Sequence, residues 1–433
     1  MMISLTISTA ILLQQLQVSN EDASEPSPVR TAYTMHASIH IDGDSGFLGS
    51  NASTGISRGS GTASDPYIIE GWEISSSTLN GIQIDNANAY FIIRNCYIHV
   101  GWSSYNSGIY LYSSGNGTIM ENVLSNNYYG IYLLSSSNNS VVNNNCSQNW
   151  GFGAYFEDSS DNSFLDNLCC SNGFSGVYLD YPSNRNDLVN NTCCTNNWNG
   201  IWLTTSTGNN LIANNCSYNS NCGIYLYYPS DSNIANNTCS GNDYGIYLEG
   251  CSNNTIMNNT CRSNIWYGLV LDGASNNTLT NNACSDNLLG IYLEDSSSFN
   301  TIAHNSICNN TLHGIYSSSS NRNTFFNNNF WYNNGATDTY ASDHAQAYDS
   351  GTGNRWNSTD GYGNFWCDWT TPDDDINGIV DRPYNISGSA GAKDWYPLTS
   401  FPYIPEFASA GAFALTTVLV AVLAIAIRRS RRA

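Results

Sequence analysis

The feature that most constrains this chain is a short unit of sequence that returns at a nearly constant interval. The unit reads Gly-Ile-Tyr-Leu at residues 108–111, and it occurs in eleven copies, the first at Gly81 and the last at Gly314. After a first interval of 27 residues, successive copies are 22 to 24 residues apart. A repeat of this length cannot bury an apolar face alone, so it must stack against its neighbours.

A second unit follows each copy from Gly108 onward, as in residues 278–284, Thr-Leu-Thr-Asn-Asn-Ala-Cys. An asparagine tolerates left-handed backbone angles, and its amide can bond to the same amide one repeat away. We therefore expect an asparagine column at one corner of the stack, and a second special corner at the glycine of each first unit. The fifth position is asparagine in all ten copies: Asn122, Asn144, Asn167, Asn191, Asn214, Asn237, Asn259, Asn282, Asn305 and Asn328.

The segments between turns are short, β-branched and aromatic, and they are broken by Asn, Ser and Gly. These are strand and turn signals, whereas a leucine-rich repeat needs regularly spaced leucines. The sequence therefore predicts an all-β fold, a right-handed parallel β-helix of about eleven rungs stacked ~4.8 Å apart.

The charge of the chain excludes one class of partner. It has 34 acidic and 13 basic residues, and four of the basic ones are arginines among the last six positions. A phosphate backbone would be repelled, so nucleic acid is not expected as a partner. Cations and neutral glycans remain compatible with this charge.

Both ends of the chain carry membrane signals. Residues 3–13 form an apolar run with the length of a signal-peptide core. Residues 408–427 are uncharged over 20 positions and precede an arginine cluster. This pattern predicts a transmembrane helix with the body of the protein outside the cell.

Residues 405–407, Pro-Glu-Phe, together with this helix and the arginines, resemble the sorting tails of archaeal surface proteins. That resemblance implies a membrane protease that cuts near residues 405–407, and a retained helical anchor stays as the alternative. The segments expected are 1–30, signal-like; 31–80, an N-terminal cap; 81–335, the β-helix; 336–400, a C-terminal cap; 401–407, a linker; 408–427, the transmembrane helix; and 428–433, a cytoplasmic tail.

Seven cysteines occupy the seventh position of the second unit in successive repeats: Cys146, Cys169, Cys193, Cys216, Cys239, Cys261 and Cys284. We expect one inward column of mostly free thiols, because Cβ atoms held at the rung spacing are too far apart for a relaxed disulfide. Small apolar packing is the simplest role, and soft-metal binding is the alternative.

The repeat and the two flanking segments resemble the NosD-type β-helix family of periplasmic and surface proteins. The opening resemblance lies in residues 41–43 and 64–71, and the closing one in residues 363–368, 381–384 and 395–398. The family's repeats are also described as carbohydrate-binding and sugar-hydrolase modules. Copper handling is not expected, because the six histidines are scattered and form no patch.

The third residue of each first unit should point outward, because Ile and Leu on either side point inward. It is aromatic in most copies, and the residue after the unit is often acidic. Either the rings stack on one another and stiffen the sheet, or they form a sugar-binding track. The candidate ligand-binding residues are Tyr155, Tyr178, Trp202, Tyr225, Tyr247, Tyr292, Glu157 and Asp180.

Glu249, Asp272 and Glu294 occupy the acidic position in three consecutive repeats. Like charges one rung apart repel unless a cation, a proton or a substrate offsets them. The spacing suits the carboxyl pair of a retaining glycosidase and equally suits Ca²⁺. A lyase is less favoured, because it needs a basic residue on this face.

A second candidate metal site is local in sequence. Asp373, Asp375, Asn377 and Asp381 match positions 1, 3, 5 and 9 of an EF-hand-like loop, whose twelfth position is Tyr384 where the motif has glutamate. The sequence predicts weak Ca²⁺ binding, with an ordinary acidic turn as the alternative.

These patterns together favour a cell-surface protein that binds polysaccharide or cell-surface glycan. A polysaccharide hydrolase or lyase using Glu249, Asp272 and Glu294 is the main alternative, and an inert envelope rod or a copper-maturation accessory protein is a third. Glycosylation of the chain itself is a further expectation, because it contains several Asn-x-Ser/Thr sequons.

Overall fold

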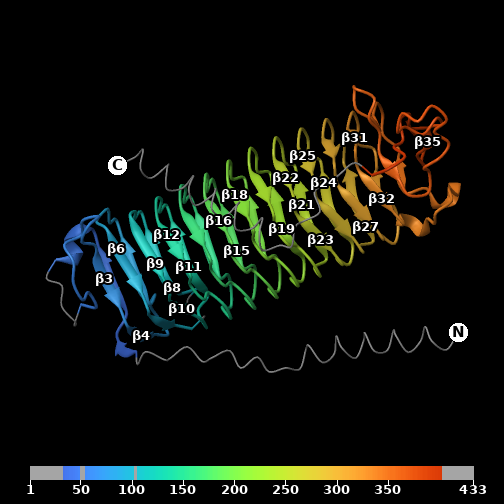
Figure 1. The fold of residues 1–433 in the computed structure, drawn as a ribbon. Coiled ribbons are helices and arrows are strands. Elements are labelled where there is room, and N and C mark those ends of the chain that lie inside the picture. Colours follow the sequence, from blue (N-terminus) through green and yellow to red (C-terminus); the bar gives the residue numbers. More distant parts are fainter. Residues whose placement is uncertain (1–32, 49–53, 102–104, 402–433) are drawn as a thin grey trace, which may run out of the picture.

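The computed structural model describes residues 33–48, 54–101 and 105–401. These residues wind into a right-handed parallel β-helix of about eleven turns, which confirms the fold class predicted from the repeat (Figure 1). The rod has three faces, and strands of successive turns pair in parallel. Turns in the middle of the rod contribute a strand to two of these faces and an isolated bridge to the third.

The first face is a sheet of thirteen strands that contains the Gly-Ile-Tyr-Leu units, and we call it the tyrosine sheet. Its strands, in spatial order, are β2 (Ile39–Asp42), β5 (Ile82–Asp85), β8 (Ser107–Tyr112), β11 (Tyr129–Leu134), β13 (Ala154–Glu157), β15 (Val177–Asp180), β17 (Ile201–Thr204), β19 (Cys222–Tyr227), β21 (Tyr244–Glu249), β24 (Tyr267–Asp272), β27 (Leu289–Glu294), β30 (Ile315–Ser317) and β33 (Ala347–Asp349).

The second face is a sheet of twelve strands, of which the last ten come from the second units and the first two from residues before them. Its strands, in spatial order, are β3 (Tyr67–Glu70), β6 (Phe91–Arg94), β9 (Gly117–Met120), β12 (Ser140–Val142), β14 (Ser163–Leu165), β16 (Asp187–Val189), β18 (Asn210–Ile212), β20 (Asn233–Ala235), β22 (Thr255–Met257), β25 (Thr278–Thr280), β28 (Thr301–Ala303) and β31 (Thr324–Phe326).

The third face has a four-stranded and a five-stranded sheet, joined by isolated parallel bridges from Val123 to Thr260. Its strands are β1 (Thr34–His36), β4 (Trp72–Ser75), β7 (Tyr97–His99) and β10 (Val123–Leu124), then β23 (Thr260–Arg262), β26 (Ala283–Ser285), β29 (Ser306–Cys308), β32 (Asn329–Trp331) and β34 (Phe365–Trp366). The remaining elements are the short 3-10 helices η1 (Asp44–Phe47), η2 (Asn333–Gly335) and η3 (Ser342–His344) and the antiparallel pair β35 (Tyr384–Asn385) and β36 (Lys393–Asp394).

The asparagine column forms as predicted, and it is one of three. Along the first column, the Nδ2 of Asn214 donates to Oδ1 of Asn237 at 3.0 Å and to the backbone oxygen of Leu188 at 2.9 Å. A second column runs from Asn127 to Asn333, and a third from Asn139 to Asn354 with Ser232 in place of one asparagine. These buried amides satisfy the backbone groups that the corners would otherwise leave unpaired.

We expected left-handed backbone at the column asparagines, but it occurs at the residue before each of them. In all ten copies the residue before the column asparagine has positive φ, as in Asn143, Asp166 and Ala213, and the column asparagine itself does not. The unit glycines do mark a special position, although Gly223 does not have positive φ. A Cβ at Gly223 would lie 2.7 Å from the backbone oxygens of Cys216 and Gly245, so glycine is needed there for close backbone approach.

The predicted cysteine column is inward and buried, and all seven of its thiols are free. Twelve of the chain's cysteines are free, which confirms the expectation of mostly free thiols. We did not foresee the disulfide between Cys170 and Cys194, which lie beside the column on consecutive turns. Their Cα atoms are 4.7 Å apart, a separation that a disulfide accepts.

Aromatic side chains pack across the C-terminal end of the stack. The Trp356 ring stacks on Phe325 at 4.3 Å between centroids, and Trp366 stacks between Phe330 and Tyr384 at 4.1 and 4.0 Å. All of these rings are fully buried, so the apolar interior is covered at this end of the rod.

Among the described residues, no helix has the length and apolar character needed to span a bilayer. The signal-like segment at 3–13, the sorting residues 405–407 and the predicted transmembrane helix at 408–427 all lie outside the described residues.

Candidate functional site

The outward aromatic residues form one column along the tyrosine sheet. Strand register places Tyr132 opposite Tyr155, Tyr155 opposite Tyr178, and Tyr178 opposite Trp202. The column continues to Tyr348 and is interrupted once, at Val270 in β24. Its aromatic members are Tyr110, Tyr132, Tyr155, Tyr178, Trp202, Tyr225, Tyr247, Tyr292, Tyr316 and Tyr348.

The rings from Tyr132 to Trp202 stack on one another, whereas Tyr110 is tilted by 60° against Tyr132. Tyr132 and Tyr155 have centroids 4.8 Å apart, Tyr155 and Tyr178 are 5.1 Å apart, and Tyr178 and Trp202 are 4.2 Å apart, all with interplanar angles of 27° or less. Parallel stacking occupies the faces of these rings. This part of the column fits the structural interpretation, in which the rings stiffen the sheet.

The rings change orientation between β19 and β30. Tyr225 meets Tyr247 at 82°, and Tyr292 meets Tyr316 at 64°. At the position between Tyr247 and Tyr292 the column holds buried Val270, so neither ring has an aromatic neighbour from the column on that side. Trp202 still stacks on Tyr225 at one end of this section, and Tyr348 stacks on Tyr316 at the other. Tyr247 and Tyr292 between them have no parallel partner within the column among the described ring contacts.

A second aromatic row, which we did not recognise in the sequence, runs beside the column. Tyr129 lies 5.5 Å from Tyr155, Phe152 lies 5.4 Å from Tyr178, and Tyr267 lies 4.9 Å from Tyr292. Its members stand one or two positions before the unit glycine, and this variable offset hid the pattern. They are Tyr129, Phe152, Phe174, Trp198, Tyr244 and Tyr267.

The acidic residues of the tyrosine sheet accept hydrogen bonds from tyrosines one turn earlier. Tyr155 donates its hydroxyl hydrogen to Asp180 at 3.1 Å, and Tyr247 donates to Asp272 at 2.9 Å. Two further pairs follow the same pattern, from Tyr132 to Glu157 and from Tyr225 to Glu249. The aromatic and acidic columns are therefore one hydrogen-bonded arrangement.

The predicted cluster of Glu249, Asp272 and Glu294 does lie on three neighbouring strands in register. Burial, together with the repulsion of nearby carboxylates, raises the pKa of Asp272 and that of Glu294 above their ordinary values. The hydroxyl groups of Tyr247 and Tyr292 act in the opposite direction on these two groups. Protons are thus held more tightly here than on an isolated carboxylate.

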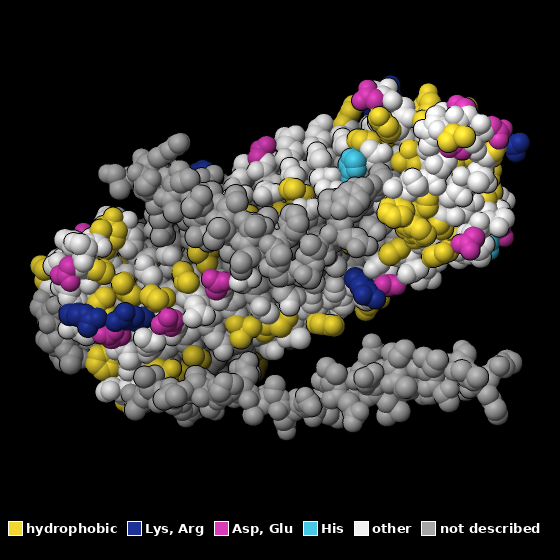
Figure 2. All heavy atoms as spheres, in the orientation of Figure 1, with side chains coloured by type: hydrophobic (Ala, Val, Ile, Leu, Met, Phe, Trp, Pro, Cys, Tyr) yellow, Lys and Arg dark blue, Asp and Glu magenta, His cyan; other side chains and the backbone are white. Residues whose placement is uncertain are grey.

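Basic side chains are absent from this face. None of the thirteen strands of the tyrosine sheet, all within the described residues, contains lysine or arginine. Arg185 pairs with Asp161 at 2.7 Å and Arg262 with Asp286 at 2.9 Å, both outside the tyrosine sheet. On the side of the molecule drawn in Figure 2, basic side chains occur in small groups, most of them beside acidic ones.

The acidic loop of the C-terminal segment brings three carboxylates together, in an arrangement that could bind a metal ion. Within the described residues, Asp373, Asp375 and Asp381 are the one group of three His, Cys, Asp or Glu residues whose candidate ligand atoms all lie within 4.8 Å of one another. The carboxylate of Asp373 accepts the backbone hydrogens of Asn377 and Gly378, both at 3.1 Å. These bonds fold the loop around its acidic residues. The thiol column and the Glu249 cluster do not form such a group.

Two protein-family models match parts of this chain. A family model described as "Right handed beta helix region" matches residues 80–238, and one described as "Periplasmic copper-binding protein (NosD)" matches residues 219–371. These two matches, over residues 80–371, support a NosD-type right-handed β-helix repeat family. No curated protein matches this NosD-type chain.

Solved structures resemble the NosD-type chain only distantly. The periplasmic alginate epimerase AlgG is 14% identical, with a TM-score of 0.48 over 69% of this chain and 83% of AlgG. The Dettilon tailspike protein is 15% identical, with a TM-score of 0.48 over 61% of each chain. The A-module of the Azotobacter vinelandii mannuronan C-5 epimerase AlgE6 is 13% identical, with a TM-score of 0.45 over 75% of this chain and 90% of that module. These likenesses carry no argument about activity.

Proposed function

We propose that this NosD-type β-helix is an extracellular protein that binds glycan on the tyrosine sheet between β21 and β30. The proposal rests on one observation. In this section, rings that have no parallel partner in the column lie beside carboxylates that can accept hydrogen bonds. Tyr247 and Tyr292 lie on the strands on either side of Val270, which interrupts the aromatic column. Asp272 and Glu294 lie in the acidic column beside these two rings. Ring faces and fixed acceptors together are the chemistry that recognises a pyranose, which has apolar C–H faces and hydroxyl edges.

The charge of the face selects the class of glycan. Carboxylates recur along the tyrosine sheet with no basic residue in its strands. A uronate or sulfated polymer would meet like charge on three consecutive strands, at Glu249, Asp272 and Glu294, and no guanidinium or ammonium group in the strands of this sheet would offset it. The ligand is therefore a neutral glycan or one that carries ammonium groups.

Binding by the purified full chain to immobilised mannan, β-glucan, chitosan and alginate tests this proposal. We expect retention on a neutral or amino polymer and none on alginate. The variant Tyr292→Leu should weaken binding about tenfold, because removing one ring contact costs ~1.4 kcal/mol. The matched control is Tyr178→Leu in the stacked section, which should bind normally. Equal loss in the two variants, or binding to alginate alone, would contradict the proposed site.

A polysaccharide hydrolase is the second candidate, and the raised pKa values of Asp272 and Glu294 favour it. A carboxyl that holds its proton, next to a second carboxyl, is the pair that glycoside hydrolysis uses, and Glu249 or Asp272 would be the second carboxyl beside Glu294. Release of reducing ends in the same screen, lost in Glu294→Gln, would establish hydrolysis. Binding without product would favour the non-catalytic role, and neither binding nor product would favour an inert rod.

We also propose that residues 408–427 attach the protein to the cell surface, with the β-helix outside. The supporting observations are the uncharged run and the arginine cluster that follows it. Proteolysis of intact cells should remove the β-helix from the surface. The mass of the mature C-terminus then distinguishes a retained helix from cleavage near residues 405–407.

Ca²⁺ binding at the acidic loop is a further part of the proposal. Asp373, Asp375 and Asp381 supply carboxylate oxygens, and Asn377 adds an amide oxygen in the same loop. The position that would carry a bidentate glutamate is Tyr384, whose ring is buried, so we expect weak affinity. Calorimetry on the full chain and on Asp373→Asn tests this, since the variant removes one carboxylate from the group.

A further inference from the structure

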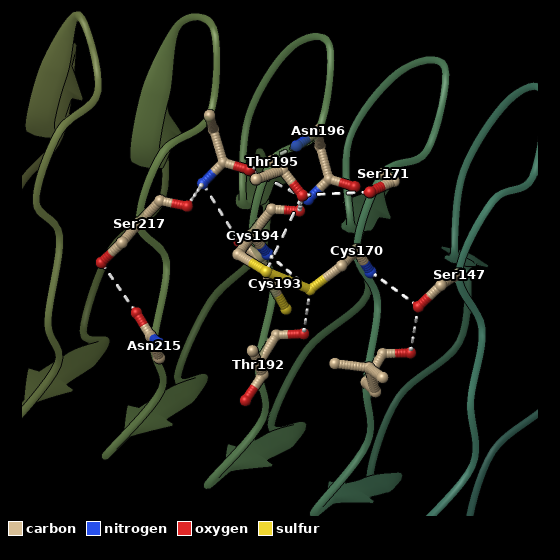
Figure 3. Close-up of a disulfide and its surroundings, with 12 residues drawn as sticks. Ser147, Cys170, Ser171, Thr192, Cys193, Cys194, Thr195, Asn196, Asn215 and Ser217 are labelled. Carbon is tan, nitrogen blue, oxygen red and sulfur yellow. Dashed lines mark hydrogen bonds between the residues drawn. A yellow bond between two sulfur atoms is a disulfide. The ribbon is translucent and has the colours of Figure 1, made fainter. Parts of the chain in front are cut away.

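The disulfide between Cys170 and Cys194 is the one sulfur–sulfur bond among the fourteen cysteines, all of which lie in the described residues. It joins the turns that follow Cys169 and Cys193 of the thiol column (Figure 3). Eleven of the twelve free cysteines are buried, and Cys308 is partly exposed. Nothing in the proposed glycan site uses this pair.

The two cysteines of the bond differ in exposure. Cys170 is 8% exposed, whereas Cys194 is more open to solvent. On the turn before Cys170, the Ser147 hydroxyl oxygen accepts the backbone hydrogen of Cys170 at 3.0 Å and is held against it. On the turn after Cys194, Ser217 donates instead to Asn215 on its own turn, at 2.7 Å (Figure 3). A nucleophile therefore approaches Cys194 more readily than Cys170.

The two sulfurs also differ as leaving groups. The backbone N–H of Cys194 donates to Sγ of Cys170 at 3.2 Å. When the bond breaks, negative charge on Cys170 would be met by this donor, and a better-stabilised thiolate leaves faster. The adjacent turns stay joined meanwhile, because Asn172 donates both its backbone and its side-chain N–H to Asn196 at 3.0 Å.

We propose that Cys170–Cys194 is a thiol–disulfide exchange site that takes low-molecular-weight thiols, with attack directed at Cys194. The incoming thiolate sulfur forms a bond to Sγ of Cys194 as the Cys170–Cys194 bond breaks. The electron pair of that bond leaves on Cys170 as a thiolate. The product is a mixed disulfide at Cys194 and a free Cys170, and a second thiolate can release Cys194 with formation of a small-molecule disulfide.

Cysteamine is a suitable probe on the folded full chain. The oxidised protein is treated with cysteamine, newly released thiols are blocked with N-ethylmaleimide before unfolding, and the adducts are mapped by mass spectrometry. We expect cysteamine on Cys194 and maleimide on Cys170, with at least tenfold preference over the reverse. Cys308 is an internal control, because it should react with maleimide but carry no cysteamine. A cysteine-containing peptide should react at least tenfold more slowly than cysteamine, since Cys194 is only partly exposed.

Preferential adduct on Cys170, equal adducts on both cysteines, or an intact disulfide after treatment would each overturn the proposal. The variants Cys170→Ser and Cys194→Ser give an independent measurement, since both lack the bond and differ only in which thiol remains. Maleimide should modify Cys194 in the first variant at least tenfold faster than Cys170 in the second. Equal rates would show that the two positions are equally accessible and would contradict the directed attack.

Discussion

Replacing one asparagine of the first column should destabilise the whole rod, and Asn214→Ala in the middle of it is the sharpest case. The Asn214 side chain is 1% exposed. Its Oδ1 accepts from the backbone N–H and the Nδ2 of Asn191, and its Nδ2 donates to Leu188 and Asn237. Alanine would leave the Asn191 N–H and the Leu188 carbonyl without these partners, both buried between turns. At ~1–3 kcal/mol for each unsatisfied buried group, the loss is about 4 kcal/mol.

Urea unfolding followed by circular dichroism measures this loss as a change in midpoint. The matched control is Asn215→Ala, the exposed neighbour whose amide oxygen accepts only from Ser217 among the described bonds. It should cost ~0.5 kcal/mol, as surface substitutions usually do. If the two variants differ by less than ~1 kcal/mol, the columns do not stabilise the stack as argued.

Three further predictions rest on single residues. Gly223→Ala should lower stability by ~3 kcal/mol or abolish folding in a urea titration, because its Cβ would meet backbone oxygens at 2.7 Å. Burial raises the pKa of Asp394 in the folded protein from 3.8 to about 6. The protonated side chain therefore stabilises the fold fully below the pKa of the unfolded state, and this stabilisation is lost as the pH rises through the pKa of the folded state. The native protein should therefore lose ~3 kcal/mol relative to Asp394→Asn between about pH 4 and pH 7, and a constant difference would contradict this. Asp373→Asn should weaken Ca²⁺ binding at least tenfold in calorimetry. Without Ca²⁺, its free energy of unfolding should stay within ~0.5 kcal/mol of that of the native protein.

The fold was predictable because the same kinds of residue return at the same positions of every repeat. Asn122 and its nine successors stand at one position of the second unit, so their column could be deduced from spacing alone. The columns headed by Asn127 and Asn139 were missed, because asparagines also fill the exposed turns and composition does not separate buried from exposed ones. Burial, which needs the coil's path, makes that distinction.

The candidate site was predictable in its residues but not in its internal geometry. Register follows from the repeat, so the neighbours of Asp272 on the adjacent strands could be named in advance. Ring orientation depends on side-chain torsions, which is why the stacked rings near Tyr178 and the inclined ones near Tyr292 could not be separated. The Cys170–Cys194 bond was missed because rung spacing was applied to the inward column, whereas these two side chains lie at a turn beside it.

The proposed function depends on the inclined section of the tyrosine sheet, and the most direct test compares two ring substitutions for glycan binding. Affinity for whichever neutral or amino polymer retains the native chain is measured for Tyr292→Leu and Tyr178→Leu, with equal unfolding midpoints as the check on folding. A loss of about tenfold in the first variant alone is the predicted result. Unchanged affinity in both variants, or an equal loss in both, would contradict a binding site between β21 and β30.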